Sequence, residues 1–204
     1  MTNIVIIKTG GSNFASIQSA LCRLGYPSQV TDEHDLILQA THVILPGVGA
    51  AGYGMRTLQN KGLDEIIPSL TQPVLGICLG MQMLCAYSAE DETICLNIIP
   101  LSVSALMGER IYPHMGWNQI TSCEDKVPLL QGISPESDFY FVHNFAPEID
   151  ASYTKAVCDY GHPFSALIQH KNFFGVQFHP EKSGEKGALV LKNFIEGLSN
   201  EHYS

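Results

Sequence analysis

The feature of this sequence that most constrains its fold is a Gly-Ile-Cys-Leu-Gly segment at residues 76–80. An apolar run at 73–77 leads into Cys78 and an apolar stretch at 81–86 follows it, so the pattern predicts a sharp turn from a strand into a helix. The two glycines leave room for a strained backbone, and such a nucleophile elbow directs the side chain at its apex away from the sheet. We therefore expect Cys78 to carry out acyl chemistry.

A base and a carboxylate are available far downstream. The strand-like run 173–178 ends in His179-Pro180-Glu181. An imidazole beside a cysteine can activate the thiol, and a carboxylate can orient the imidazole, so the sequence contains a nucleophile, a base and an orienting group.

The other cysteines carry no such signal. They lack flanking glycines, form no Cys-x-x-Cys pair and do not stand at zinc-finger spacing from a histidine. We expect free, mostly buried and inert thiols, with no bound metal and no cofactor. These cysteines are Cys22, Cys85, Cys95, Cys123 and Cys158.

Length and composition bound the remaining possibilities. The 204 residues, 45% of them hydrophobic, predict a single domain over residues 1–204. A formal charge of -9 without a lysine or arginine cluster argues against binding to nucleic acid or to an anionic membrane. No apolar stretch approaches the roughly eighteen residues of a spanning helix, and the N-terminus does not have the form of a signal peptide. We expect a cytoplasmic protein.

The order of apolar patterns predicts an α/β fold. In the first half, strand-like runs at 4–7, 42–45 and 73–77 alternate with helical patterns around 17–24 and 53–59, which indicates βαβ units and a parallel sheet. The second half contains strand-like runs at 101–105, 139–143, 156–159, 164–169 and 173–178, followed by a helix at 188–198. We expect one mixed, largely parallel central sheet flanked by helices.

Two glycine-containing loops follow predicted strands. The Pro-Gly-Val-Gly loop at 46–49 directly follows the predicted strand at 42–45. In a parallel sheet it should therefore lie at the same edge as Cys78, which is the edge where ligands bind. Its backbone N–H groups and that of Leu79 could form an oxyanion hole, or the loop could be a plain turn; the spacing leaves both open. For the Gly-Gly-Ser-Asn segment at 10–13 we favour a turn with Ser12 or Asn13 as a helix cap over a nucleotide site.

Three aromatic residues are candidates for a pocket or a partner surface. His114 and His143 lie in segments rich in aromatic residues or glycine. Trp117 is the only tryptophan in the sequence, and core packing and an interface anchor are equally compatible with it.

Taken together, these segments resemble the class I glutamine amidotransferases. Residues 76–82 and 175–181 look like the two signatures of that family, and the resemblance covers essentially the whole chain. The segments 46–49, 114–118, 140–143 and 182–184 further resemble the glutaminase subunits of imidazole glycerol phosphate synthases, which act in histidine biosynthesis.

The resemblance implies a flavodoxin-like fold and a role for each matching residue. Cys78, His179 and Glu181 would form the catalytic triad, Gly47, Val48 and Leu79 the oxyanion hole, and Gln82 would help bind the substrate L-glutamine. The implied partner is a (βα)₈-barrel cyclase that consumes the ammonia, and Asn13, Trp117, Tyr140, His143 and Lys182 match positions that face it.

Two alternatives remain at this point. The chain could be the glutaminase of another synthase, of which a sugar-amidating system built on a duplicate of the same subunit pair is the hardest to exclude. It could also be a docking subunit without catalytic activity, although that would predict a missing triad member, and all three are present.

Overall fold

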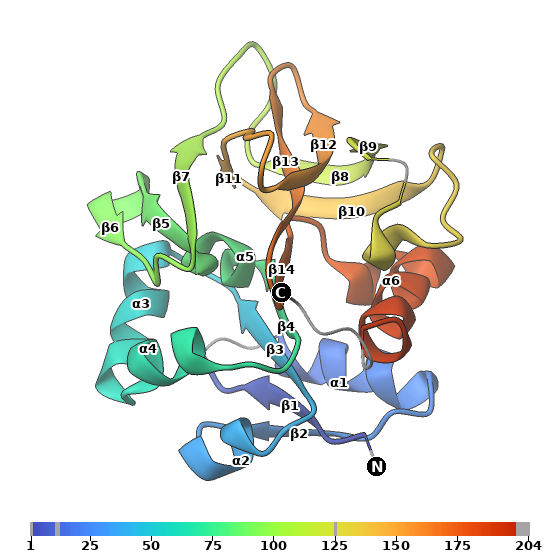
Figure 1. Ribbon diagram of the computed structural model, residues 1–204. Helices are drawn as coiled ribbons and strands as arrows, with labels where there is room; N and C mark the ends of the chain where they lie inside the picture. The colour runs from blue at the N-terminus through green and yellow to red at the C-terminus, as the bar shows by residue number, and fades with distance from the viewer. Residues whose placement is uncertain (1, 11–12, 125, 199–204) are drawn as a thin grey trace.

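The central sheet places the ends of several strands at one edge. The computed structural model describes residues 2–10, 13–124 and 126–198, and within them one sheet has eight strands in the order β2-β1-β3-β4-β14-β13-β12-β9 (Figure 1). Strands β2 to β14 in this order are parallel, and β13, β12 and β9 continue antiparallel. The strands are β1 (Ile4–Ile7), β2 (Ser28–Thr31), β3 (His42–Gly47), β4 (Val74–Cys78), β9 (Thr121–Ser122), β12 (Thr154–Asp159), β13 (Pro163–His170) and β14 (Phe173–Val176).

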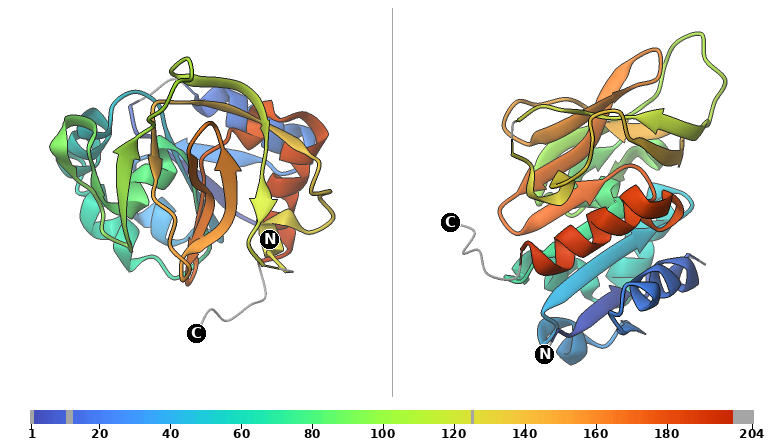
Figure 2. Two further views of the ribbon diagram at one scale, coloured as in Figure 1. Left: turned by 90° about the horizontal axis from the view of Figure 1, so that it is seen from above. Right: turned by 90° about the vertical axis from the view of Figure 1, so that its right-hand side faces the viewer.

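Helices cover both faces of this sheet, as the views in Figures 1 and 2 show. Helices α1 (Phe14–Arg23) and α6 (Gly184–Glu196) pack on one face. The other face is covered by α2 (His34–Leu38), α3 (Ala51–Asn60), α4 (Leu63–Ile66) and α5 (Leu79–Leu84). Short 3₁₀ turns complete the connections: η1 (Ile67–Ser69), η2 (Glu90–Glu92), η3 (Pro128–Leu130) and η4 (Pro180–Lys182).

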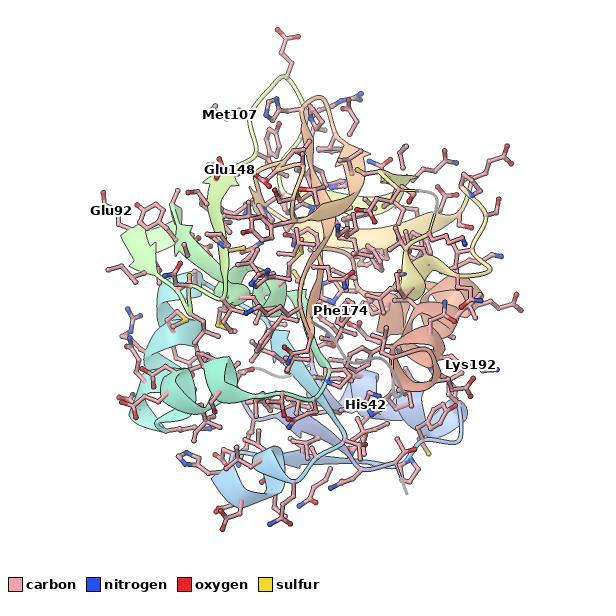
Figure 3. All side chains as sticks on the ribbon, viewed as in Figure 1. His42, Glu92, Met107, Glu148, Phe174 and Lys192 are labelled. Carbon is pink, nitrogen blue, oxygen red and sulfur yellow. The ribbon has the colours of Figure 1, made fainter. Side chains whose placement is uncertain are left out.

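Strand β1 shows why the parallel strands read as continuous apolar runs. Ile4 and Ile6 belong to the hydrophobic cluster under α1 and α6, whereas Val5 and Ile7 belong to the cluster under α2 to α5. Successive side chains of a strand point to opposite faces, so a strand covered by helices on both sides is apolar throughout. The interior is filled in the same way further along the sheet. Phe174 of β14 is fully buried, whereas Met107, in the loop after β7, is exposed (Figure 3).

The central sheet is mixed and largely parallel, as predicted, and the second half of the chain forms two smaller sheets in addition, which were not predicted. One has the order β11-β7-β5-β6, and the other is the antiparallel pair β8 and β10. Their strands are β5 (Cys85–Ser88), β6 (Thr93–Ile94), β7 (Ile99–Ala105), β8 (His114–Gln119), β10 (Asp138–His143) and β11 (Phe145–Pro147). Between α5 and α6 the described residues contain no α-helix, and these strands are connected by turns, loops and short 3₁₀ segments.

Most predicted elements are confirmed, with differences at their ends. The expected helix after Cys78 stops at Leu84, because Cys85 and Ala86 begin strand β5. The C-terminal helix starts at Gly184, earlier than expected. No strand was predicted for β2 or β8, whose sequences are largely polar. Among the helices in the described part of the chain, none combines the length and apolarity needed to cross a membrane.

Candidate active site

Cys78 lies on the predicted elbow. It ends β4 with φ +54° and ψ −111°, a strained conformation for a residue other than glycine, and α5 begins at the next residue. A Cβ atom on Gly76 would lie 2.7 Å from the backbone N of Met81, and a Cβ on Gly80 would collide with the carbonyl oxygen of Leu45. Both flanking glycines are therefore required by the close approach of α5 to β3 and β4.

His179 and Glu181 are brought to the elbow by sheet pairing. Strand β14 is parallel to β4, with Val176 opposite Ile77, so the residues after β14 continue beside Cys78. The Nδ1 atom of His179 lies 2.8 Å from Oε1 of Glu181, and the two side chains are 3% and 0% exposed. Nε2 of His179 is buried and has no hydrogen-bond partner among the residues that the structure describes. With Nδ1 engaged by the carboxylate, Nε2 is the nitrogen left for Cys78.

The electrostatics of the pair favour its charged form. Burial opposes a positive charge on His179, but the interactions of the ring with Cys78 and Glu181 outweigh burial and raise the pKa of His179. Burial also opposes the charge on Glu181, but His179 and Asn13 hold the pKa of this carboxyl below its ordinary value. A positive imidazole beside Cys78 favours the thiolate, which is the reactive form of a cysteine.

Asn13 adds a second donor to the carboxylate of the triad. Its Nδ2 atom donates to Oε1 of Glu181 at 2.6 Å. This corrects the expected helix cap, because Asn13 stands at the N-cap position of α1 but makes no side-chain capping hydrogen bond. Gly11 and Ser12, the other residues of that prediction, lie outside the described residues. Asn13 thereby fixes the oxygen that accepts from His179.

A pair of buried glutamines contacts the nucleophile. Nε2 of Gln177, in the turn after β14, lies 3.6 Å from Sγ of Cys78. Gln82 on α5 donates from its Nε2 to Oε1 of Gln177 at 3.0 Å and to the carbonyl oxygen of Phe145 at 2.7 Å. Gln177 was not predicted from the sequence. In the sequence it is one polar residue in an otherwise apolar run, two residues before His179, and that position alone does not mark it as a site residue.

A pocket of about 310 Å³ opens over the cysteine. It is lined by residues of the elbow and α5, of the end of β3 and the loop after it, of η2, of the segment before β8, of the end of β10 and the residues that follow it, and of the turn that carries His179. They are Gly47, Val48, Gly49, Cys78, Leu79, Gln82, Glu90, Pro113, Val142, His143, Asn144, Phe145, His179 and Lys182.

The loop after β3 reaches the elbow. Strand β3 continues through Gly47, past the predicted end at Leu45, and Gly47 is paired with Cys78. A Cβ on Gly47 would lie 2.7 Å from the backbone N of Gly80. Gly47 and Val48 therefore line the same pocket as Leu79, as the oxyanion interpretation requires.

Glu90 is a pocket residue that the sequence did not reveal. Its Oε2 accepts the backbone N–H of Ala51 at 2.7 Å, which anchors the start of α3 just after the glycine loop. Burial raises the pKa of Glu90, opposed by that hydrogen bond. No motif marks the position, because an acidic residue in a run of Glu and Asp is usually a solvated one.

Three of the residues expected at a partner surface form one exposed patch. Trp117 is 59% exposed, which excludes a core role, and its ring packs edge-on against Tyr140 at a centroid distance of 6.0 Å. Nζ of Lys182 lies 5.8 Å from the centroid of the Tyr140 ring. Met115, 61% exposed on the same strand as Trp117, was not predicted. We call Met115, Trp117, Tyr140 and Lys182 the aromatic patch.

The other two residues expected there are turned inward. Asn13 bonds Glu181, and His143 is 6% exposed, with its side chain in the pocket wall. Nδ1 of His143 lies 2.9 Å from the carbonyl oxygen of Phe145, and Nε2 lies 3.1 Å from Nδ1 of His114. Burial lowers the pKa of His143 to about 3 and that of His114 to about 4, so both rings are neutral.

All six cysteines are free. Cys22 and Cys123 are exposed rather than buried as expected, whereas burial raises the pKa of Cys95 to about 11 and that of Cys158 to about 12. The described residues contain no group of three or more His, Cys, Asp or Glu side chains that could hold a metal ion.

An elbow cysteine, a buried His–Glu pair and a glycine loop meet at the ends of parallel strands, and comparisons with known proteins identify the family. The model of the class-I glutamine amidotransferase family matches residues 5–198. The chain is 48% identical over 199 residues to imidazole glycerol phosphate synthase subunit HisH of Pasteurella multocida, covering 97% of this chain and 100% of the relative. The HisH subunit of Idiomarina loihiensis is 47% identical over 195 residues, 95% of this chain and 97% of the relative. The chain therefore belongs to the class-I glutamine amidotransferases and, within them, to the HisH family.

Solved structures share the fold at much lower sequence identity. A glutamine amidotransferase structure has a TM-score of 0.76 at 15% identity, covering 97% of this chain and 99% of the other. PurLQS from Thermotoga maritima has a TM-score of 0.71 at 16% identity, covering 97% and 99%. These matches confirm the predicted fold class.

Proposed function

We propose that the chain is the glutaminase subunit of an imidazole glycerol phosphate synthase, which hydrolyses L-glutamine to glutamate and ammonia for histidine biosynthesis. The observation that carries this proposal is the strained Cys78 elbow beside the buried His179–Glu181 pair. The HisH relatives, similar over nearly their whole length, support the specific pathway.

In the first half of the reaction, the Cys78 thiolate attacks the side-chain carbonyl carbon of glutamine. The negative charge that develops on the carbonyl oxygen is stabilised by backbone N–H groups of Leu79 and of Gly47 or Val48, which we assign to the oxyanion hole. His179 then gives its proton to the leaving nitrogen. Ammonia departs and leaves a γ-glutamyl thioester on Cys78.

In the second half, water breaks the thioester. His179, now neutral, takes a proton from the attacking water, and a second tetrahedral intermediate collapses to glutamate and the Cys78 thiolate. Glu181 does not react but orients the imidazole through Nδ1 and stabilises its positive charge. Asn13 holds Glu181 in place for both halves.

The pocket also contains groups suited to the α-carbon end of glutamine. Both N–H groups of the Gln82 amide are used, on Gln177 and on Phe145, so only its carbonyl oxygen is left to accept a hydrogen bond from the substrate. Glu90 has its Oε2 on Ala51 and is the carboxylate best placed to bind the α-ammonium group. Lys182 supplies a positive charge at the rim for the α-carboxylate.

The ammonia that the reaction releases has to be passed to a second subunit that uses it. It must reach the second reaction unprotonated, so the site has to open into a sealed interface rather than into water. We assign the aromatic patch to that interface because Lys182 belongs to both the pocket and the patch. The implied partner is the (βα)₈-barrel cyclase subunit, which carries the lyase step. We also propose that residues 1–204 act as one domain in the cytoplasm.

The alternatives are weaker. A glutaminase for another synthase would share the triad, and a sugar-amidating system remains the nearest such case. A subunit without catalytic activity would be expected to lack a triad member, whereas this sequence contains Cys78, His179 and Glu181, and His179 contacts Glu181.

The deciding experiment is an assay of glutamine hydrolysis by the purified chain, alone and with a candidate cyclase and its phosphorylated substrate. We expect a poor glutaminase alone and a rise by orders of magnitude with the liganded partner, because a missing oxyanion donor is worth about 3 to 4 kcal/mol of barrier. Full activity of the chain alone would contradict the coupling, and no activity in any combination would contradict the assignment.

A further inference from the structure

We infer that Gln177 is a catalytic residue of this site, whose side-chain amide donates an N–H to the sulfur of Cys78 and favours its ionised form. The role of this thiolate in turnover rests on the proposed function. The hydrogen bond itself is a property of the folded chain and can be tested without glutamine.

The geometry puts the amide against the reacting atom. Nε2 of Gln177 lies 3.6 Å from Sγ of Cys78, within the range of a hydrogen bond to sulfur, and Gln177 is 0% exposed. Gln177 directly follows β14, the neighbour of β4 in the sheet, and its backbone N–H is bound to the carbonyl oxygen of Ala166. The sheet holds its backbone, and its buried side chain is positioned by contacts with Gln82 and Cys78.

The orientation of the amide follows from its partners. The carbonyl oxygen of Phe145 is only an acceptor, so the group of Gln82 that lies 2.7 Å from it must be the NH₂. The same NH₂ lies 3.0 Å from one end of the Gln177 amide, which must therefore be the oxygen. The other end of Gln177, facing Cys78, is then the NH₂. A backbone carbonyl thus fixes both amides and makes Gln177 a donor to sulfur.

Other groups near the sulfur disfavour a negative charge on it, so a hydrogen-bond donor is needed there. The carbonyl oxygen of Val142 lies 3.8 Å from Sγ; it can accept from a thiol but repels a thiolate. The titratable groups that line the same pocket are His179, Lys182, Glu90 and His143, and Glu90 adds negative charge. A neutral donor at Gln177 stabilises the thiolate while His179 is charged, and continues to do so after His179 has given up its proton.

A purely structural role for Gln177 would be to satisfy Gln82 and join β14 to α5. The two roles differ in what they predict for Cys78. A structural amide changes the melting temperature when it is removed but leaves the ionisation of the thiol unchanged. A donor to sulfur shifts the pH at which Cys78 becomes reactive.

The test is the rate of Cys78 alkylation by iodoacetamide in the full chain, followed at that residue by peptide mass spectrometry between about pH 5 and pH 9. We expect Gln177→Leu to raise the midpoint by about one pH unit, a tenfold loss of thiolate below the midpoint. Gln177→Glu keeps the shape and the acceptor for Gln82 but presents a carboxyl group to sulfur, and should raise the midpoint further. It also serves if the leucine variant does not fold.

Asn172→Leu is the matched control. Asn172 is also a buried amide next to β14, but its Nδ2 donates to the carbonyl oxygens of Leu70 and Gln72, away from Cys78. Its loss should lower stability and leave the alkylation midpoint unchanged. In glutamine hydrolysis with the partner present, Gln177→Leu should lower kcat about tenfold and change KM less than about twofold.

Folded Gln177→Leu and Gln177→Glu variants with the wild-type midpoint would overturn the inference and leave the proposed function intact. If the variants shift the alkylation midpoint but the wild-type chain hydrolyses no glutamine with any candidate partner, the hydrogen bond to sulfur is supported and the proposed function is rejected.

Discussion

The residues around Cys78, here called the catalytic cluster, lie beside the aromatic patch. In each region the side chains depart from the usual rule that polar groups are exposed and large apolar groups are buried. Around Cys78, charged and amide side chains are buried: His179, Glu181 and Gln177 are almost inaccessible to solvent. In the patch, Trp117 and Met115 are more than half exposed. Buried charges and exposed large apolar groups both cost stability or solubility, which supports the functions that we propose for the two regions: chemistry in the first and partner binding in the second.

The two regions are joined through the backbone as well as by proximity. The N–H of His179 is bound to the carbonyl oxygen of Tyr140, and the N–H of Tyr140 is bound to Oγ of Ser183. The backbone N–H and carbonyl groups of Tyr140 are therefore both hydrogen-bonded to the segment that carries His179 and Glu181. The comparison predicts separable effects for side chains, since substitutions in one region should leave the other's function intact.

The largest effect is expected at the nucleophile. Cys78→Ala should lower glutamine hydrolysis by about 10⁶-fold, because the thiol supplies the covalent step and little core volume. Affinity for the cyclase, measured by titration calorimetry, should stay as in wild type. Substantial turnover in this variant would sink the triad assignment, and lost affinity would show that the regions are not separable.

The partners of Cys78 should follow in order of their roles. His179→Ala should cost about as much as Cys78→Ala, and Glu181→Gln about a hundredfold less, because an orienting group usually matters less than a nucleophile or base. Steady-state kinetics with the liganded cyclase would measure both. A variant that kept the wild-type rate would remove that residue from the triad.

Substitutions in the aromatic patch should lower the affinity for the cyclase rather than the chemistry at Cys78. Trp117→Ala should weaken association with the cyclase by about 2 kcal/mol, as is typical of aromatic hot spots, with little change in the melting temperature of the free chain. Calorimetric titration and thermal melting decide the matter together. Unchanged affinity with a loss of several degrees in melting temperature would mean that Trp117 stabilises the fold and that the docking face lies elsewhere.

The smallest effect concerns His114 and His143, at the border of the two regions. Their pKa values are lowered to about 4 and about 3 in the folded chain, so below the ordinary value of about 6.5 the unfolded chain binds protons that the folded chain does not. The free energy of unfolding should therefore decrease as the pH is lowered, by about 1 to 2 kcal/mol for each of the two histidines between about pH 6.5 and about pH 5. Denaturant titrations should show a flatter dependence for His143→Gln; an equal slope would mean that His143 is charged in the fold.

The sequence predicted the elements whose signals are local. The elbow, the strands β1, β3 and β4, and the helices α1 and α3 follow from apolar periodicity and from glycines at fixed positions. The candidate triad residues could also be selected from the sequence, because their two motifs are short and contiguous; their catalytic role stays a prediction. The exposed position of Trp117, in contrast, could not be derived from its own segment, which left core and surface equally open.

The residues that were missed or misplaced depend on contacts between distant segments. Gln177 and Glu90 enter the site through side-chain contacts with α5 and α3, which no local pattern encodes. Asn13 was expected at a helix cap, but its amide binds a carboxylate 168 positions away; its place at a partner face stays a prediction. The division into several sheets was missed because strand signals do not specify which strands pair.

The order of strands in the central sheet has a consequence for synthesis. Cys78 and Gln177 are 99 positions apart in the chain, yet their strands β4 and β14 are neighbours. During synthesis on the ribosome, the segment that contains Cys78 is complete well before the segment that contains Gln177. If the proposed function holds, incomplete copies contain the nucleophile without its hydrogen-bond donor, and we expect them to be inactive on glutamine.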